Sequence, residues 1–326
     1  MKPLAAGVLA RLADGGFHSG EVLARTLESS RASVWNAVRE LEATGIEIYK
    51  VHGRGYRLAY PVTLLDRAAI ERHLAGHGGR FTIEVLDTVD STNTVALQRA
   101  ADGAPDRTVI AAEWQSGGRG RLGRAWHAGV GEALTFSLLW RSGRGAGALS
   151  GLTLAVGVAL ARALGAAGAE SVALKWPNDV LWRRGKLAGV LTELQGDALG
   201  PTAVVIGVGL NVRLSEATRA RIGQPAADLE TACGAAPDRN RLLAGVLIEL
   251  DRVLEAFGRG GFAAVRDEWQ RHHAQQDRRV TLTLADGKRR SGRARGVADN
   301  GALLLETPSG IQRFHSGEIS LRPQRP

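Results

Sequence analysis

The amino-acid sequence predicts an α+β protein of three successive segments, each with its own pattern of apolar residues. Residues 1–62 combine helical spacing with a short hairpin, which predicts a winged helix-turn-helix. Residues 63–274 alternate strand and helix patterns with strands in excess, which predicts a mixed sheet with helices on one face. Residues 275–326 hold short strands and tight turns, which predicts a small β-barrel of SH3 type.

The first segment shows three helical stretches before its hairpin. The Gly15-Gly16 pair ends the first stretch, and Ser19 is the natural N-cap of the second. After a tight turn at Glu28-Ser29-Ser30, either Ser29 or Ser30 caps the third helix, which Gly45 ends in a left-handed conformation. The stretch "IEIYKVHGRGYRLAY" then predicts two strands around a Gly-Arg-Gly turn, which is the wing.

Two short helices joined by a three-residue turn bind DNA when the second helix enters the major groove. Helical spacing places polar side chains on the face opposite the apolar stripe, and one arginine lies in the wing. The candidate DNA-binding residues are Arg31, Ala32, Trp35, Asn36, Arg39 and Arg54. The alternative is a winged helix used only for packing or protein contacts, since these sixty residues carry nearly balanced charge.

The central and third segments are predicted from their periodicity and turn residues. Strands are expected at 81–86, 109–114, 134–140, 172–176, 187–194 and 204–208, and helices at 66–74, 92–101, 149–164 and 239–257. In the third segment, "VTLTL", "GALLLE" and "GEISL" are expected as strands between Gly-containing turns.

Composition limits the class of protein. The net charge of +9 is compatible with nucleic acid, with an acidic partner or with simple solubility. A single cysteine, Cys233, excludes an internal disulfide and fits a reducing compartment, so a cytoplasmic protein is expected. Arg11 interrupts the apolar N-terminal run, which indicates a helix rather than a signal peptide. No apolar run reaches the roughly 18 residues of a membrane span.

The stretch "GGRGRLGR", residues 117–124, is a glycine-hinged strip of cations. It is not a P-loop, because Gly-Lys-Ser/Thr is missing, and it lacks the strand and helix context of a dinucleotide fingerprint. Forked guanidinium groups grip phosphates or carboxylates, and the glycines would let the loop order around such a ligand. A solvated basic loop is the alternative.

Four further stretches of the central segment carry polar groups or gaps near the ends of predicted strands. "DSTNT" places Ser91 as N-cap at a strand-to-helix junction, where free backbone N–H groups bind a carbonyl or an anion. "KWPND" and "GKLAG" bring Lys175 and Lys186 to neighbouring strands. In "VVIGVGLNV", Gly207 and Gly209 leave gaps against which a ligand or a ring could lie. Ordinary sheet construction would explain each stretch taken alone.

Together, these motifs resemble those of the bifunctional biotin–protein ligases that also act as biotin operon repressors. The resemblance runs in order through "FHSGE", "SRASVWNAVREL", "GRGYRL", "DSTN", "EWQSGGRGRLGRAW", "KWPNDV", "KLAGVLTEL", "GVGLNV" and "GALLLE…GEISLR". It implies a central domain similar to class II synthetases, and an ATP-dependent, AMP-forming ligase. Such enzymes activate biotin to biotinyl-5'-adenylate and transfer biotin to a lysine of the carrier subunit of acetyl-CoA carboxylase.

The resemblance also implies roles for individual residues. Catalytic roles fall to Arg119, Arg121, Lys175 and Lys186. Biotin would contact Ser91, Thr92, Asn93, Gln115, Arg119, Gly120, Arg121 and Lys186. ATP and the adenylate would contact Arg121, Arg124, Trp126, Asn178, Asp179 and Asn211. Mg²⁺ would be held through the substrate phosphates, with Asp179 as its candidate protein ligand.

A second function is implied by the winged helix. In the family, the adenylate favours a homodimer that binds a two-fold symmetric operator. Here two departures stand out: the segment after "GVGLNV" lacks the tryptophan that covers the adenylate in some members, and Leu122 occupies the middle of the cationic strip. The rival interpretations are a lipoate–protein ligase, a biotin-sensing transcription factor without ligase activity, and a ligase without a regulatory role.

Overall fold

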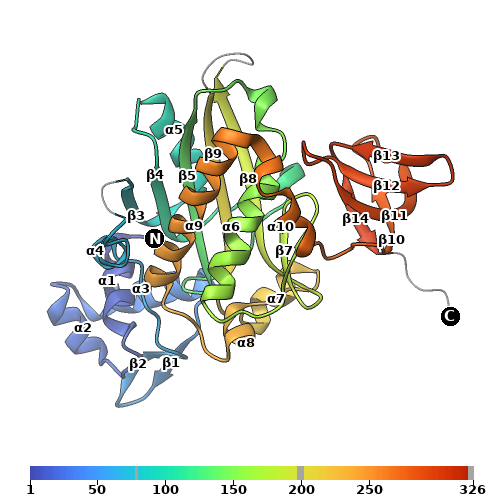
Figure 1. Ribbon diagram of the computed structural model, residues 1–326. Helices are drawn as coiled ribbons and strands as arrows, with labels where there is room; N and C mark the ends of the chain where they lie inside the picture. Colours follow the sequence, from blue (N-terminus) through green and yellow to red (C-terminus); the bar gives the residue numbers. More distant parts are fainter. Residues whose placement is uncertain (78–79, 197–201, 322–326) are drawn as a thin grey trace, which may run out of the picture.

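A computed structural model of the chain describes residues 1–77, 80–196 and 202–321. Figure 1 shows the three expected units in sequence order, with the N-terminal helices and the C-terminal sheet on different sides of the central domain. The boundaries expected after residues 62 and 274 remain predictions. Residues at both positions contact an adjoining unit, so no gap in packing marks either boundary. Val62 packs into the winged-helix core, and the backbone N–H of Ala274 donates to the carbonyl of Leu174.

The N-terminal unit is a winged helix-turn-helix. It comprises α1 (Pro3–Leu12), α2 (Gly20–Thr26), α3 (Arg31–Ala43), β1 (Ile48–Val51) and β2 (Gly55–Leu58). Ser19 and Ser30 cap α2 and α3, each accepting a hydrogen bond from the backbone three residues later. The buried stripe of α3, including Val34, Val38 and Leu41, packs on α1 and leaves the opposite face exposed.

The central unit is built on a seven-stranded mixed sheet. Its strands are β3 (Thr82–Val89), β4 (Thr108–Gln115), β5 (Ala133–Ser142), β6 (Val172–Lys175), β7 (Asp179–Trp182), β8 (Gly185–Gly196) and β9 (Thr202–Asn211). The order is β3-β4-β5-β9-β8-β7-β6; β3 and β4 are parallel, and the other neighbouring pairs are antiparallel. Strand β7 forms where only a turn was expected, because it pairs with both β6 and β8.

Helices cover this sheet in two unequal layers. On one face, α6 (Leu152–Ala166) and α9 (Arg239–Gly260) pack together over the main core, and α4 (Arg67–His73) packs on α9, as expected. On the other face lies α5 (Thr92–Ala101), which departs from the expectation of helices on one face only. Ala96 and Ala100 of α5 contact Ile110, Leu139 and Val205 of the sheet. This second layer places the N-terminus of α5 beside the strands that carry the glycine gaps.

Further short elements complete the central domain. These are η1 (Arg121–Gly123), η2 (Ala146–Leu149), α7 (Glu216–Ile222), α8 (Leu229–Cys233), η3 (Gly261–Ala264) and α10 (Arg266–Arg271). The stretch 146–166, with mean hydropathy 1.6, is long and apolar enough to cross a membrane. However, 67% of its most apolar window is buried in the fold, so the packing of α6 against the sheet and against α9 accounts for its composition.

The C-terminal unit is a five-stranded antiparallel sheet of β10 (Arg279–Thr283), β11 (Arg289–Val297), β12 (Leu303–Thr307), β13 (Gly310–Phe314) and β14 (Glu318–Leu321). Its order is β13-β12-β11-β10-β14, so β13 and β14 form the edges among the described strands. Residues 322–326 of the expected domain lie outside the described residues. Trp176 Nε1 donates to the carbonyl of Gly301 at 3.0 Å, which ties this unit to the central domain.

Candidate active site

A cavity of about 150 Å³ opens between the sheet, α5, the cationic strip and the C-terminal sheet. The expected ligand-binding residues of the central domain all line it: Ser91, Thr92, Asn93, Gln115, Arg119, Gly120, Arg121, Arg124, Trp126, Lys175, Asn178, Asp179, Lys186 and Asn211. These residues come from five separate stretches of the chain. The ends of several strands therefore meet around one cavity, which is the candidate active site.

The cationic strip folds as a hairpin over this cavity, which we call the cationic hairpin (residues 118–126). The backbone N–H of Gly120 donates to the carbonyl of Arg124, and that of Trp126 donates to the carbonyl of Gly118. At its tip, the short 3₁₀ turn η1 holds Leu122 in the left-handed region at φ 56°, where a bulky residue is uncommon. The arginines are thus presented by a hydrogen-bonded hairpin whose tip is exposed.

The glycine gaps in β9 are filled by side chains of the protein itself. A Cβ atom at Gly209 would lie 2.5 Å from the indole of Trp126, and one at Gly207 would overlap the Oδ1 atom of Asn93. The ring that was expected to lie against this strand is therefore Trp126, from the end of the cationic hairpin. The ring lies against the sheet at Gly209 and forms one wall of the cavity.

One end of the cavity, which we call the inner end, is lined by hydrogen-bonding groups from α5 and β4. The backbone N–H of Thr92 donates to Gln115 Oε1 at 2.7 Å, so the first turn of α5 and the end of β4 are fixed together. The Oγ of Ser137 lies 2.6 Å from Asn93 Oδ1 and 2.8 Å from Thr92 Oγ1. Ser91 occupies the N-cap position, but its side chain makes no capping hydrogen bond, contrary to expectation. Its hydroxyl is not committed to the helix end.

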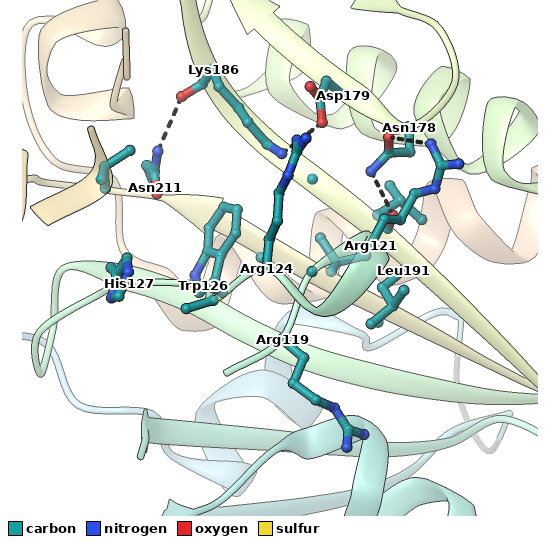
Figure 2. A pocket seen from close by; sticks show the side chains of 18 of the residues that line it. Arg119, Arg121, Arg124, Trp126, His127, Asn178, Asp179, Lys186, Leu191 and Asn211 are labelled. Atoms are coloured by element: carbon teal, nitrogen blue, oxygen red, sulfur yellow. Dashed lines mark hydrogen bonds and ion pairs between the residues drawn. The ribbon is translucent and has the colours of Figure 1, made fainter. Parts of the chain in front are cut away.

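Charged groups gather in the middle of the cavity, which we call the cationic centre. Lys186 Nζ lies 2.6 Å and Lys175 Nζ 3.8 Å from the Asp179 carboxylate, so two strand lysines share one carboxylate. Arg121 donates to Asn178 Oδ1 at 3.3 Å, and burial lowers the pKa of its guanidinium from the ordinary arginine value. Figure 2 shows Arg121, Asn178, Asp179 and Lys186 on one side of the hairpin. This centre is suited to a phosphate or a carboxylate.

Arg119 lies apart from these cations. Figure 2 shows its side chain pointing away from Lys186 and Asp179. Its guanidinium donates to Thr94 Oγ1 at 3.1 Å and lies 3.7 Å from Glu193 Oε2, beside the inner end. The structure therefore separates two arginines that the motif presents as equivalent. Arg121 belongs to the cationic centre, and Arg119 does not.

The other end of the cavity, which we call the outer end, is formed by Asn211 and by residues that the sequence did not reveal. Asn211 is buried and donates to the carbonyls of Lys186 and Ala227, whereas its Oδ1 has no hydrogen-bond partner among the described residues. Ile222 and Gln224, from the segment that lacks the tryptophan, line this end together with His127. The segment after "GVGLNV" therefore reaches the cavity with an apolar and an amide side chain.

The C-terminal sheet supplies a further residue that was missed. Glu318 of β14 lines the cavity, and its carboxylate lies 2.5 Å from a guanidinium nitrogen of Arg124. No local motif marks Glu318, because only the packing of the two units brings it to the hairpin. The one signal that the sequence offered was the position of Glu318 in the "GEISL" stretch, which belongs to the family resemblance.

The described residues contain no cluster of three metal-ligating side chains. Asp179 is the one carboxylate among the strand lysines, and it is already paired with both of them. A site of this kind fits Mg²⁺ that arrives on substrate phosphates, since magnesium commonly uses one or two carboxylates besides phosphate oxygens. A cage built from protein ligands alone does not fit.

The candidate DNA-binding side chains lie on the exposed face of the winged helix. Arg31, Ala32, Trp35, Asn36, Arg39 and Arg54 are all exposed. The guanidinium of Arg39 lies 4.9 Å from the centre of the Trp35 ring, and that of Arg54 lies 4.0 Å from the Phe17 ring. α3 and the wing thus present a cationic and aromatic surface away from the core, as a groove-binding element requires.

Comparison with known proteins agrees with this arrangement. Residues 85–211 match the Biotin/lipoate A/B protein ligase family, residues 277–322 the Biotin protein ligase C terminal domain, and residues 7–57 an HTH domain. The Bifunctional ligase/repressor BirA of Escherichia coli (strain K12) is 38% identical over 315 residues, which cover 97% of this chain and 96% of the relative.

Two further proteins extend the comparison. The Biotin--[acetyl-CoA-carboxylase] ligase of Mycobacterium tuberculosis is 35% identical over 262 residues, covering 78% of this chain and 95% of that protein. The solved structure of biotin protein ligase from Aquifex aeolicus in complex with biotin and ATP is 29% identical, with a TM-score of 0.63, and covers 74% of this chain and 98% of that chain. This chain belongs to the biotin protein ligase family, among the members that carry an N-terminal helix-turn-helix domain.

Proposed function

We propose that the protein is a biotin–protein ligase, which uses ATP to activate biotin and transfers it to a lysine of a biotin carboxyl carrier protein. The observation that best supports this proposal is that one continuous cavity contains the inner end, the cationic centre and the outer end. A polar inner end fits the ureido ring, a cationic centre fits the reacting anions, and an outer end beside Trp126 and Asn211 fits the adenine. Asn211 Oδ1 is free to accept a hydrogen bond from an exocyclic amino group.

The first reaction brings two anions together. A carboxylate oxygen of biotin attacks the α-phosphorus of ATP, the bond to the bridging oxygen breaks, and pyrophosphate leaves with its electron pair. Arg121, Lys175 and Lys186 lie where this negative charge is concentrated. Groups that are already positioned stabilise the transition state without further reorganisation. Mg²⁺ bound to the phosphates, with Asp179 as its candidate protein ligand, would add positive charge there.

The second reaction needs no nucleophile from this chain. The neutral amine of the carrier lysine attacks the acyl carbon, the acyl–oxygen bond breaks, AMP leaves and the amine loses a proton. Because water competes for the same mixed anhydride, the cationic hairpin must cover it until the carrier arrives. Its ordered pairing over the cavity supports that role.

The test is biotin-dependent exchange of pyrophosphate into ATP, followed by transfer of biotin to a carrier domain. We expect both activities, and no labelling when the carrier lysine is replaced by arginine. Exchange with lipoate but not biotin would identify a lipoate ligase instead. Absence of exchange with either acid would favour a sensor without ligase activity and contradict the proposal.

We further propose that the winged helix binds operator DNA as a homodimer that the adenylate promotes, so the protein would also repress genes of biotin synthesis. One strand edge supports dimer formation. Pairing of β8 with β7 ends at Gly189, so the described residues beyond Val190 pair with β9 on one side only, and Leu194 is 48% exposed. An unpaired strand edge is a ready surface for sheet-to-sheet association.

A cytoplasmic location follows from these substrates and partners.

A further inference from the structure

A buried amide at the inner end of the cavity is completely occupied by the protein. Asn93 is 3% exposed, and its Nδ2 donates to Glu193 Oε2 at 2.6 Å and to the carbonyl of Leu191 at 3.4 Å. Its Oδ1 accepts from Ser137 Oγ at 2.6 Å, and Gly207 leaves the space in which this amide lies. Asn93 therefore shapes the inner end from a fixed orientation, with Glu193 as its charged acceptor.

The same carboxylate oxygen also faces the cationic hairpin. Glu193 Oε2 lies 3.7 Å from a guanidinium nitrogen of Arg119, which donates to Thr94 Oγ1 of α5. One carboxylate on β8 thus meets a side chain from α5 and a side chain from the hairpin. Arg119 is held over the inner end by these two contacts and is kept away from the cationic centre.

Resting on the proposed function, we propose that Glu193 is a positioning residue for biotin. It fixes the Asn93 amide within the inner end and anchors Arg119 as a strap across the mouth at that end. Its contacts do not include Arg121, Lys175 or Lys186, which act on the phosphates. Glu193 therefore controls the binding of the acid, and the phosphoryl chemistry proceeds without it.

Two substitutions separate the two contacts. Glu193→Gln keeps an oxygen that accepts from Asn93 but removes the negative charge that faces Arg119. Glu193→Ala removes both contacts and leaves the buried Asn93 amide without its charged acceptor. A half-exposed ion pair contributes little, whereas a buried donor that loses its acceptor is costly.

The measurement is biotin-dependent pyrophosphate exchange, with KM for biotin, KM for ATP and kcat determined separately. We expect the KM for biotin to rise about threefold in Glu193→Gln and about tenfold or more in Glu193→Ala. The kcat and the KM for ATP should stay within about twofold of wild type, because the phosphate contacts are intact. Glu170→Gln, an exposed carboxylate of the same domain, is the matched control and should leave every constant unchanged.

A double-substitution cycle distinguishes positioning from general stabilisation of the fold. In an Arg119→Gln background, the further change Glu193→Gln should no longer raise the KM for biotin, since the strap is already lost. An unchanged KM for biotin in Glu193→Gln, or the same rise with and without Arg119, overturns this inference. These outcomes presuppose exchange in the wild type; its absence would overturn the proposed function instead.

Discussion

At the scale of single residues, the site depends on two missing side chains as much as on the charged ones. Gly207 and Gly209 lie on one face of β9, and each leaves room for a side chain from elsewhere in the chain. Asn93 fills the first space and Trp126 the second. The second glycine therefore fixes the depth at which the indole wall of the cavity lies.

Gly209→Ala tests this dependence. The new Cβ would lie within 2.5 Å of the Trp126 indole, so the ring must move into the cavity. Because overpacking of this kind costs about 1–3 kcal/mol, the Kd of the adenylate should rise about tenfold or more. Equilibrium dialysis with labelled adenylate measures it. Gly165→Ala, in α6 with open space around it, is the control and should leave binding unchanged.

The sequence predicted a ring or a ligand against these glycines but not which ring. A strand with gaps indicates close approach, and that inference needs only local pattern. The partner, Trp126, is brought there by pairing within the cationic hairpin, which local pattern does not report. Glu318 was missed for the same reason, since it reaches the site only when two units pack together.

At the scale of elements, neighbouring arginines of the cationic hairpin contact different parts of the site. Arg121 faces Asn178 at the cationic centre, Arg124 faces Glu318 of the C-terminal sheet, and Arg119 faces α5. The motif indicated an anion-binding loop, which stays a prediction that the cavity beneath the hairpin supports. The direction of each side chain could not be predicted, because it depends on left-handed φ values at Leu122 and Gly123 in the tip.

A second arrangement at this scale anchors the linker between the winged helix and the sheet, which includes Thr63 and Leu65. The buried Arg239, at the start of α9, pairs with the buried Glu113 of β4 and donates to the carbonyls of Thr63 and Ala133. Glu113 also accepts from the backbone N–H of Leu65 at 2.9 Å. The linker is thus held by a charged pair that is itself fully hydrogen-bonded.

Glu113→Gln should destabilise the central domain by about 3 kcal/mol, because it leaves the Arg239 charge buried without its counterion. The shift of the urea midpoint, followed by circular dichroism, measures this loss. Glu71→Gln interrupts an exposed pair with Arg67 and should cost no more than about 0.5 kcal/mol. Equal shifts for the two variants would contradict the assigned role of the buried pair.

At the scale of the whole molecule, the two proposed functions occupy separate surfaces. The candidate DNA-binding side chains lie on α3 and the wing, whereas the cationic hairpin lies over the central sheet. Val130, a few residues beyond the hairpin, is nevertheless buried in the winged-helix core. The chain that lines the cavity therefore continues directly into the contact between the two units.

Adenylate binding should accordingly strengthen operator binding. We expect a lower protein concentration for half-saturation of an inverted-repeat operator when biotinyl-adenylate is present, measured by gel shift. Coupling of this kind commonly amounts to about 1–3 kcal/mol, or about 5- to 150-fold in affinity. Arg39→Ala should weaken operator binding with pyrophosphate exchange unchanged. Equal operator affinity with and without the adenylate would contradict the proposal that the adenylate regulates DNA binding.

The three-unit architecture followed from periodicity together with capping and turn residues, because each unit has a distinct pattern of these. The sequence did not predict β7, β11, β13, α7, α8 or α10. The strands among these form by pairing with strands that adjoin them in the chain, β7 with β6 and β8, β11 with β10 and β12, and β13 with β12. It also did not place α5 on its own face of the sheet. Short elements carry too few residues for a periodic signal, and tertiary contacts decide them.

The central claim is that the cationic hairpin retains a reactive acyl-adenylate. The most direct measurement incubates the protein with biotin and ATP, removes free ligand by gel filtration, and follows the adenylate that stays bound and its transfer to a carrier domain. Wild type should retain the adenylate and transfer it, whereas Arg121→Gly should lose it at least about tenfold faster. Equal retention by the two proteins would contradict the claim.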